Sequence, residues 1–94
     1  EKGEVEDQLG VALLECGRPR EAIDRFEALL AKRPQDADLL YYLSQAHALA
    51  ARQSSETLRA QHPRSPRSLQ LLGEEYAAAG NRVAALQALR AALD

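Results

Sequence analysis

The side chains most able to react in this chain are its one cysteine, Cys16, and its two histidines, His47 and His62. A cysteine nucleophile needs a base beside it in a cleft, and a zinc ion needs about four ligands at short spacings. Neither Cys-x-x-Cys nor His-x-x-x-His occurs, and a single cysteine excludes an internal disulfide. We therefore expect no metal site, and we expect Cys16 to be a small buried side chain.

Paired carboxylates are the next candidates for acid–base chemistry. Glu74 and Glu75 are adjacent, so on a helix their side chains point about 100° apart and cannot share a substrate. Glu4 and Asp7 share a helix face, but acidic residues in a first turn more commonly stabilise the helix dipole. No Ser-His-Asp set and no phosphate-binding glycine loop is present. The sequence thus predicts a non-enzymatic protein with no catalytic residue and no cofactor.

A run of basic side chains, Arg59, His62, Arg64 and Arg67, could contact phosphate. Nucleic-acid binders of this kind combine a strongly basic surface with interleaved aromatic residues. This run has no such aromatics, and the whole chain carries a net charge of −2. We expect a solvated surface that could dock an acidic partner, and no binding of nucleic acid.

The composition points to helices as the elements that position these residues. Leu and Ala dominate and are strong helix formers, whereas the strand formers Val and Ile are scarce. The length suits one domain over residues 1–94. No apolar run approaches the ~18 residues of a membrane span, so no membrane contact is expected. Because the chain lacks an initiator Met and ends abruptly, we expect a piece of a longer protein; the compartment stays open, with the cytoplasm favoured.

Two amphipathic helices are predicted in the first third of the chain. Apolar residues recur at spacings of three and four on each of them, which is the pattern of one helix face. The stripes are Val5, Leu9, Ala12, Leu13 and Cys16 in residues 4–16, and Ala22, Ile23, Phe26, Leu29 and Leu30 in the next helix. Gly17 suits the left-handed end of the first helix, Pro19 suits the first turn of the second, and Pro34 ends it.

The same unit returns near the C-terminus with every position displaced by 63, so that Leu9 and Gly10 become Leu72 and Gly73. A third copy between them is displaced by 34 at its start but by only 29 at its closing proline, Pro63, so it has lost five residues. In this alignment His47 falls where the other copies have Leu13 and Tyr76. We therefore expect His47 to be a packed core histidine.

The middle copy has two interpretations. Its apolar spacing from Leu40 to Gln61 fits one uninterrupted helix of roughly 26 residues. Alternatively the helix breaks at Arg52–Ser54, with Ser54 or Ser55 as N-cap and Glu56 in the first turn. We favour the break, because serine is a poor helix interior and a good cap. A continuous helix would hold the last unit away from the first, and the fold could then be completed only by pairing with another molecule.

The repeat of 34 residues resembles the tetratricopeptide repeat. The residues that carry the resemblance are Leu9, Gly10, Leu13, Ala22, Phe26 and Pro34 in the first unit, and Leu69, Leu72, Gly73, Tyr76, Ala85 and Leu89 in the last. The resemblance implies an all-α fold in which antiparallel helical hairpins stack as a short right-handed solenoid, with repeats at 3–36, 37–65 (shortened) and 66–94. It also suggests a bacterial protein-interaction scaffold without enzymatic activity.

Proteins similar to this one bind peptides in a groove lined by the first helix of each repeat. The resemblance places the partner-binding groove at Asp7, Val11, Asp38, Tyr41, Gln45, Arg67, Gln70 and Glu74. Of the positions that hold a peptide carboxylate in chaperone-binding members, only Arg67 fits here, and Asp7 would repel a carboxylate. We expect Tyr41 to be the anchor, because tyrosine offers a large contact area at low entropic cost.

Self-association is the alternative function. The first helix is acidic, with Glu1, Glu4, Glu6, Asp7 and Glu15 against Lys2, while residues 52–67 are basic. The last helix has no capping helix, which leaves Leu86, Leu89 and Leu93 partly uncovered. Copies could therefore form a homo-oligomer, either stacked head to tail or exchanging helices through the shortened repeat.

Overall fold

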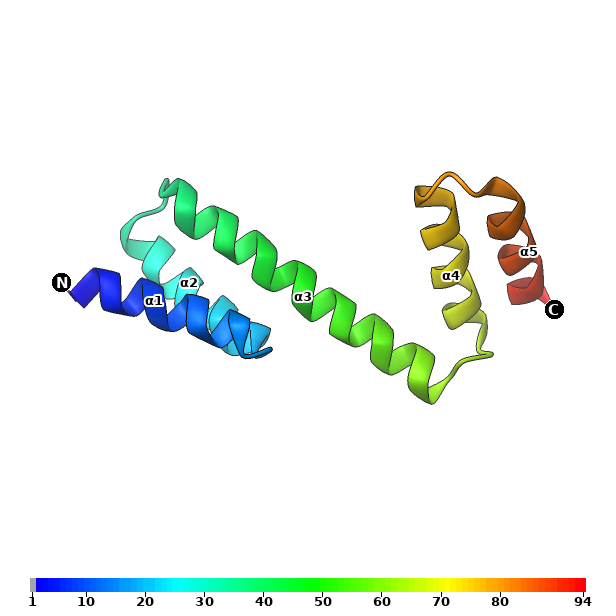
Figure 1. The fold of residues 1–94 in the computed structure, drawn as a ribbon, viewed down its shortest axis with the longest axis horizontal. Helices are drawn as coiled ribbons and strands as arrows, with labels where there is room; N and C mark the ends of the chain where they lie inside the picture. Colours follow the sequence, from blue (N-terminus) through cyan, green and yellow to red (C-terminus); the bar gives the residue numbers. More distant parts are fainter. Residues whose placement is uncertain (1) are drawn as a thin grey trace. The chain divides into compact units, whose positions relative to one another are not determined.

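The computed structural model describes residues 2–94, with side chains from Glu4 onward, so Glu1 of the acidic first segment lies outside the described residues. This part of the chain forms helices and no strand (Figure 1). The helices are α1 (Lys2–Glu15), α2 (Pro19–Lys32), α3 (Ala37–Gln61), α4 (Pro66–Ala78) and α5 (Arg82–Leu93). The predicted all-α fold class is confirmed.

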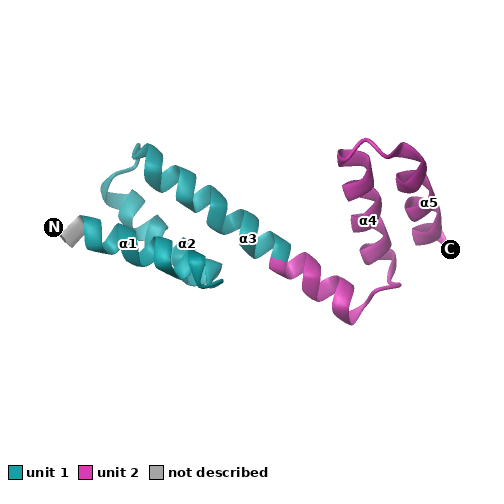
Figure 2. Cartoon of the chain, viewed as in Figure 1, with its two compact units in different colours: residues 1–52 teal, residues 53–94 magenta. Residues whose placement is uncertain are grey.

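The chain divides into two compact units, residues 1–52 and residues 53–94, and the division falls inside α3 (Figure 2). In the first unit α1 and α2 pack together as a hairpin, and in the second unit α4 and α5 do the same. Each hairpin turns on a glycine with a left-handed backbone, Gly17 (φ 76°) or Gly80 (φ 83°). These conformations are the reason for glycine at both turns.

The core of the first unit is built on α2. Its buried apolar side chains are Ala22, Phe26 and Leu29 from α2, with Leu39 and Ala46 from α3. Ile23 and Leu30 pack against this core, so the predicted stripe of the second helix is confirmed. On α1, a Cβ added at Gly10 would lie 2.5 Å from Cε1 of Phe26, so the two helices cross closely at this point.

The stripe predicted for the first helix is only partly correct. Leu13 packs against the core, but Val5, Leu9, Ala12 and Cys16 are exposed. The close contact of Gly10 with the Phe26 ring turns a different face of α1 inward. That face includes Val11 and Leu14, both of which pack against the core.

The favoured break near Ser54 is wrong, because α3 is one helix of 25 residues that runs through this position. Neither Gly nor Pro occurs within α3 to end it. The Thr57 hydroxyl donates to the Gln53 carbonyl at 2.9 Å, so its polar group is satisfied without a break. Ser54 is exposed, and an exposed serine costs a helix only about 0.5 kcal/mol relative to alanine.

The second unit joins its helices through short polar contacts. Ser65 caps α4 by accepting from the Ser68 amide at 3.2 Å, and the buried Ser68 hydroxyl donates to the His62 carbonyl at the end of α3. Asn81 caps α5 by accepting from the Ala84 amide at 3.1 Å. A Cβ added at Gly73 would lie 2.8 Å from Cγ of Leu89, so α4 and α5 cross closely at a position where only glycine fits without a shift.

Candidate functional site

A hollow opens between α1 and the first half of α3, inside the first unit. It has a volume of about 360 Å³, within the lower range of small-ligand pockets. We name it the α1–α3 hollow; its lining is Asp7, Gln8, Val11, Ala12, Glu15 and Tyr42. It therefore combines an apolar floor with a carboxylate at each end of the α1 segment.

A series of aromatic rings leads from the core to this hollow. The Phe26 and Tyr42 rings stack with their centroids 5.9 Å apart and an interplanar angle of 18°. The Tyr41 ring meets Tyr42 edge-on, with centroids 5.4 Å apart and an angle of 71°. Phe26 is fully buried, whereas Tyr41 is 59% exposed. The Tyr42 ring in the wall of the hollow is thus held on both sides, and Tyr41 presents its ring to solvent beside it.

Asp7 is held by an ion-pair network at the end of α2. Arg33 donates to Asp7 Oδ1 at 2.7 Å and to Asp36 Oδ2 at 3.2 Å. The hydrogen bond to Asp7 raises the pKa of Arg33 above its ordinary value; desolvation opposes this rise, and the charges of Asp7, Asp36 and Glu6 add to it. Arg33 therefore stays cationic and compensates Asp7, so Asp7 acts as part of a pair rather than in the acidic first turn of α1, which holds Glu4.

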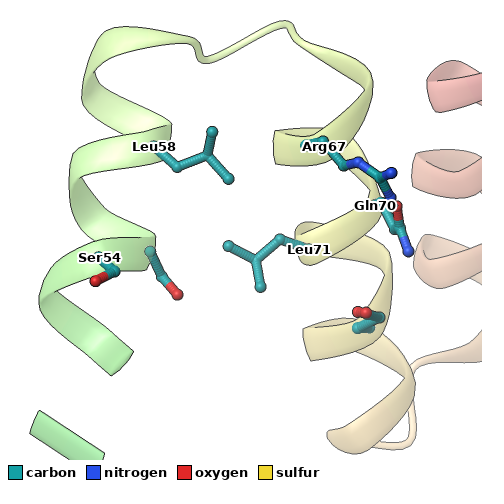
Figure 3. Close-up of a pocket in the computed structure, with 7 residues that line it drawn as sticks. Ser54, Leu58, Arg67, Gln70 and Leu71 are labelled. Carbon is teal, nitrogen blue, oxygen red and sulfur yellow. Dashed lines mark hydrogen bonds between the residues drawn. The ribbon is translucent and has the colours of Figure 1, made fainter. Parts of the chain in front are cut away.

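A second hollow lies inside the second unit, between the last turns of α3 and helix α4 (Figure 3). We name it the α3–α4 hollow, and its volume is about 320 Å³. Its lining is Ser54, Ser55 and Leu58 from α3, with Arg67, Gln70, Leu71 and Glu74 from α4. The Leu58 and Leu71 side chains point toward one another across it.

The charged groups around this second hollow differ in their pairing. Arg59 of α3 forms an ion pair with Glu75 of α4, so Arg59 is not simply a solvated residue as the sequence predicted. Arg67 donates to the amide oxygen of Gln70 at 2.8 Å, and within residues 4–94 its guanidinium has no carboxylate partner. Arg67 is thus a positioned cation whose charge is available to a ligand.

The residues predicted for the groove fall into three groups. Asp7 and Val11 meet in the α1–α3 hollow, and Arg67, Gln70 and Glu74 meet at the α3–α4 hollow. Asp38, Tyr41 and Gln45 are exposed on α3 and line neither hollow.

Sequence reasoning about the groove missed two kinds of residue. It did not find the Arg33 partner of Asp7, because the two residues are 26 positions apart and no local spacing links them. It also missed Leu58 and Ser55, because it favoured a break where the helix is continuous. The hydrophobic period of a single long helix, which was the other interpretation, would have pointed to Leu58.

The predicted positions of Cys16 and His47 are corrected by the structure, since both side chains are exposed. Cys16 lies on the outward face of α1, opposite the face that Gly10 turns to Phe26. The core of the first unit meets α3 through Leu39 and Ala46, whereas His47 is exposed to solvent. Within the described residues, no cluster of three or more Cys, His, Asp and Glu side chains could hold a metal ion.

The helices of the described chain include none long and apolar enough to cross a membrane. In comparisons with known proteins, residues 4–46 match the family model described as "Tetratricopeptide repeat". This segment holds α2 and parts of α1 and α3, and it includes both walls of the α1–α3 hollow. Comparison with curated proteins and with solved structures gave no match.

Proposed function

We propose that this chain, whose residues 4–46 match the tetratricopeptide repeat family model, is a non-enzymatic scaffold that binds a peptide or a partner protein. Tetratricopeptide repeats are generally modules of protein–protein interaction, typically without catalysis. The residues proposed to contact the partner are Asp7 and Val11 on α1 and Asp38, Tyr41 and Gln45 on α3 in the first unit, and Arg67, Gln70 and Glu74 on α4 in the second unit.

The observation that carries this proposal is the α1–α3 hollow, with Tyr42 in its lining and the exposed Tyr41 ring in contact with Tyr42. Aromatic side chains with a polar tip bury a large area on binding and lose little rotamer freedom, which is why they dominate binding energies at interfaces. Tyr42 is fixed between Phe26 and Tyr41. Tyr41 is therefore an exposed anchor that is already positioned beside the α1–α3 hollow. It should lose little conformational entropy when a ligand binds.

The charges around the α1–α3 hollow favour a ligand with a basic side chain. Arg33 already neutralises Asp7, but Glu15 at the hollow and Asp38 beside Tyr41 are exposed carboxylates. A cation over the exposed face of Tyr41 would add an attraction of about 0.5–1 kcal/mol. We propose that the ligand is a segment with an apolar side chain for the hollow and a neighbouring Lys or Arg.

Peptide selection followed by a matched pair of variants tests this function. Peptides of random sequence are selected on the whole chain from a display library, and the affinity of a synthetic representative is then measured by fluorescence anisotropy. We expect enrichment of apolar–basic sequences, with Tyr41→Ala weakening binding about tenfold or more, the loss of about 1.4 kcal/mol or more typical of an interface anchor. Tyr41→Phe, which keeps the ring, should bind nearly as the native chain does.

Selected peptides whose affinity is unchanged in both Tyr41 variants and in Val11→Asp would argue against this site. Failure to select any sequence above background would argue against peptide binding altogether. Circular dichroism on each variant shows whether the helices are intact, so that a loss of binding is not confused with unfolding.

Self-association is a second candidate function, and exposed apolar side chains on two helices favour it. Val5 and Leu9 on α1 and Leu86, Leu89 and Leu93 on α5 are all at least 40% exposed. The partial exposure expected for the three α5 leucines is thus confirmed. Large apolar side chains grouped on one helix face commonly mark an interaction surface.

A further inference from the structure

The outward face of α1 carries an apolar stripe that nothing in its own unit covers. Val5, Leu9, Ala12 and Cys16 recur at spacings of four, three and four, so they lie within a narrow arc of the helix. All four are exposed, and Val5 retains 63% of its surface. We name this face the α1 stripe. It has the dimensions of the contact face of an amphipathic helix that packs into a groove.

A hollow between α4 and α5 offers a groove of the matching kind. It has a volume of about 500 Å³ and lies within the second unit. Its lining is Pro66, Arg67 and Gln70 from α4, with Leu89, Ala92 and Leu93 from α5. We name it the α4–α5 hollow. Leu93 retains 88% of its surface, and Leu86 on the same face of α5 retains 50%, so large apolar area stays in contact with water.

The two surfaces carry opposite charge. The exposed charged side chains flanking the α1 stripe are Glu4 and Glu15, and neither Lys nor Arg occurs in α1 after Lys2. The lining of the α4–α5 hollow includes Arg67, whose guanidinium has no carboxylate partner within residues 4–94. The first turn of α4 also lacks an acidic residue, so a carboxylate placed there would meet both Arg67 and the positive end of the helix dipole.

We propose that the α1 stripe of one molecule docks into the α4–α5 hollow of a second copy of the chain. This inference rests on the proposed self-association and names the two surfaces that carry it. Apolar burial of Val5, Leu9, Leu86 and Leu93 supplies the attraction, because these side chains are otherwise exposed. The carboxylates of α1 against Arg67 of α4 set which helix is accepted and in which direction.

The contact is heterologous, because two different surfaces of the chain meet. Each molecule in such a contact keeps one surface of each kind free, so copies add in series unless the series closes into a ring. One helix in one groove buries a small area, and contacts below about 1,200 Å² are commonly weak and transient. We therefore expect association that depends on concentration.

A mixing experiment with two variants tests this directly, with light scattering to measure mass under reducing conditions. The first variant, Val5→Lys with Leu9→Lys, blocks the α1 stripe. The second, Leu86→Glu with Leu93→Glu, blocks the α5 side of the hollow. The average mass of the native protein in solution is expected to rise above the 10.3 kDa of the monomer as the protein concentration increases from about 10 μM to 1 mM. Each variant alone is expected to stay monomeric, and an equimolar mixture is expected to give a dimer and no larger species.

Two results would overturn the proposal. One is a native chain that stays monomeric throughout this concentration range. The other is association that persists in either variant alone, which would assign self-association to other surfaces. Circular dichroism and thermal unfolding of both variants verify that they fold, and Gln87→Glu on α5 serves as a control for the added negative charge.

The variants also separate this proposal from peptide binding. None of the four substituted residues lines the α1–α3 hollow, and none of them is Tyr41. The peptide affinity of both variants should therefore match that of the native chain, even where their mass differs. A chain that binds peptides but does not associate would refute the docking of α1 and leave the proposed groove intact.

Discussion

Two glycines in this chain are needed for their lack of a side chain inside helices. Gly10 lies against the Phe26 ring, and Gly73 lies against Leu89, each at the point where two helices of a hairpin cross. A helix interior normally disfavours glycine by about 0.5–1 kcal/mol relative to alanine. The contacts therefore offset an unfavourable backbone, because they bring the helices closer together than alanine would permit.

Gly10→Ala is predicted to lower the free energy of unfolding by about 1 kcal/mol. The added Cβ would meet Phe26 at 2.5 Å, and overpacking of this kind typically costs about 1–3 kcal/mol, part of which the better helix propensity of alanine offsets. Urea unfolding followed by circular dichroism gives the value. In a Phe26→Leu background, where the ring is absent, the same substitution should cost less or become stabilising. An equal cost in both backgrounds would show that Phe26 is not the cause.

At the scale of the helices, some features could be predicted from the sequence and others could not. The turns at Gly17 and Gly80 and the buried stripe of α2 were predictable, because positive φ and periodic burial leave local signals. The orientation of α1 was not predictable in the same way. Its apolar residues fit a stripe containing Leu9 and Cys16, but the decisive contact joins Gly10 to Phe26, sixteen positions away.

The continuity of α3 was missed for a different reason. Ser54 and Ser55 carry a cap signal, yet a cap forms only where the preceding helix ends, and no Gly or Pro ends α3 before them. The burial of His47 was predicted wrongly because the alignment assumed that equivalent positions of all three copies face the core. The candidate groove was predictable as a set of helix positions, but its division between two hollows depends on side-chain packing.

Ser54→Ala distinguishes the continuous helix from a break by the sign of its effect. In a continuous helix, alanine replaces an exposed interior serine and should raise stability by about 0.5 kcal/mol. At an N-cap, the same substitution would lower stability by about 1 kcal/mol. Thermal and urea unfolding of the variant measure the difference. A clear loss of stability, with Gln53→Ala as the neighbouring control, would contradict an uninterrupted α3.

At the scale of the whole molecule, the two units differ in the size of their cores. The first unit buries Phe26, Leu29 and Leu39, whereas the buried apolar side chains of the second are Ala85 and Ala88. Burial of a large apolar side chain contributes about 1.5–3 kcal/mol, and that of an alanine contributes much less. The first unit is therefore expected to hold its structure more strongly than the second.

Native-state hydrogen exchange tests this difference residue by residue. Amides of α2 are predicted to exchange more slowly than those of α4 and α5, because local opening requires less energy where fewer apolar contacts are lost. A substitution in the buried core, such as Phe26→Ala, should increase the amide exchange rates most strongly in α2. Equal protection of both hairpins in the native chain would indicate that they unfold as one cooperative body.

The central claim is that the chain binds a peptide at the α1–α3 hollow, with Tyr41 as anchor. Titration of the isotope-labelled whole chain with a selected apolar–basic peptide, followed by amide chemical shifts, tests it most directly. We predict the largest shifts at Val11, Glu15, Tyr41 and Tyr42, and their loss in Tyr41→Ala. Saturable shifts that leave these residues unmoved and persist in Tyr41→Ala would contradict it.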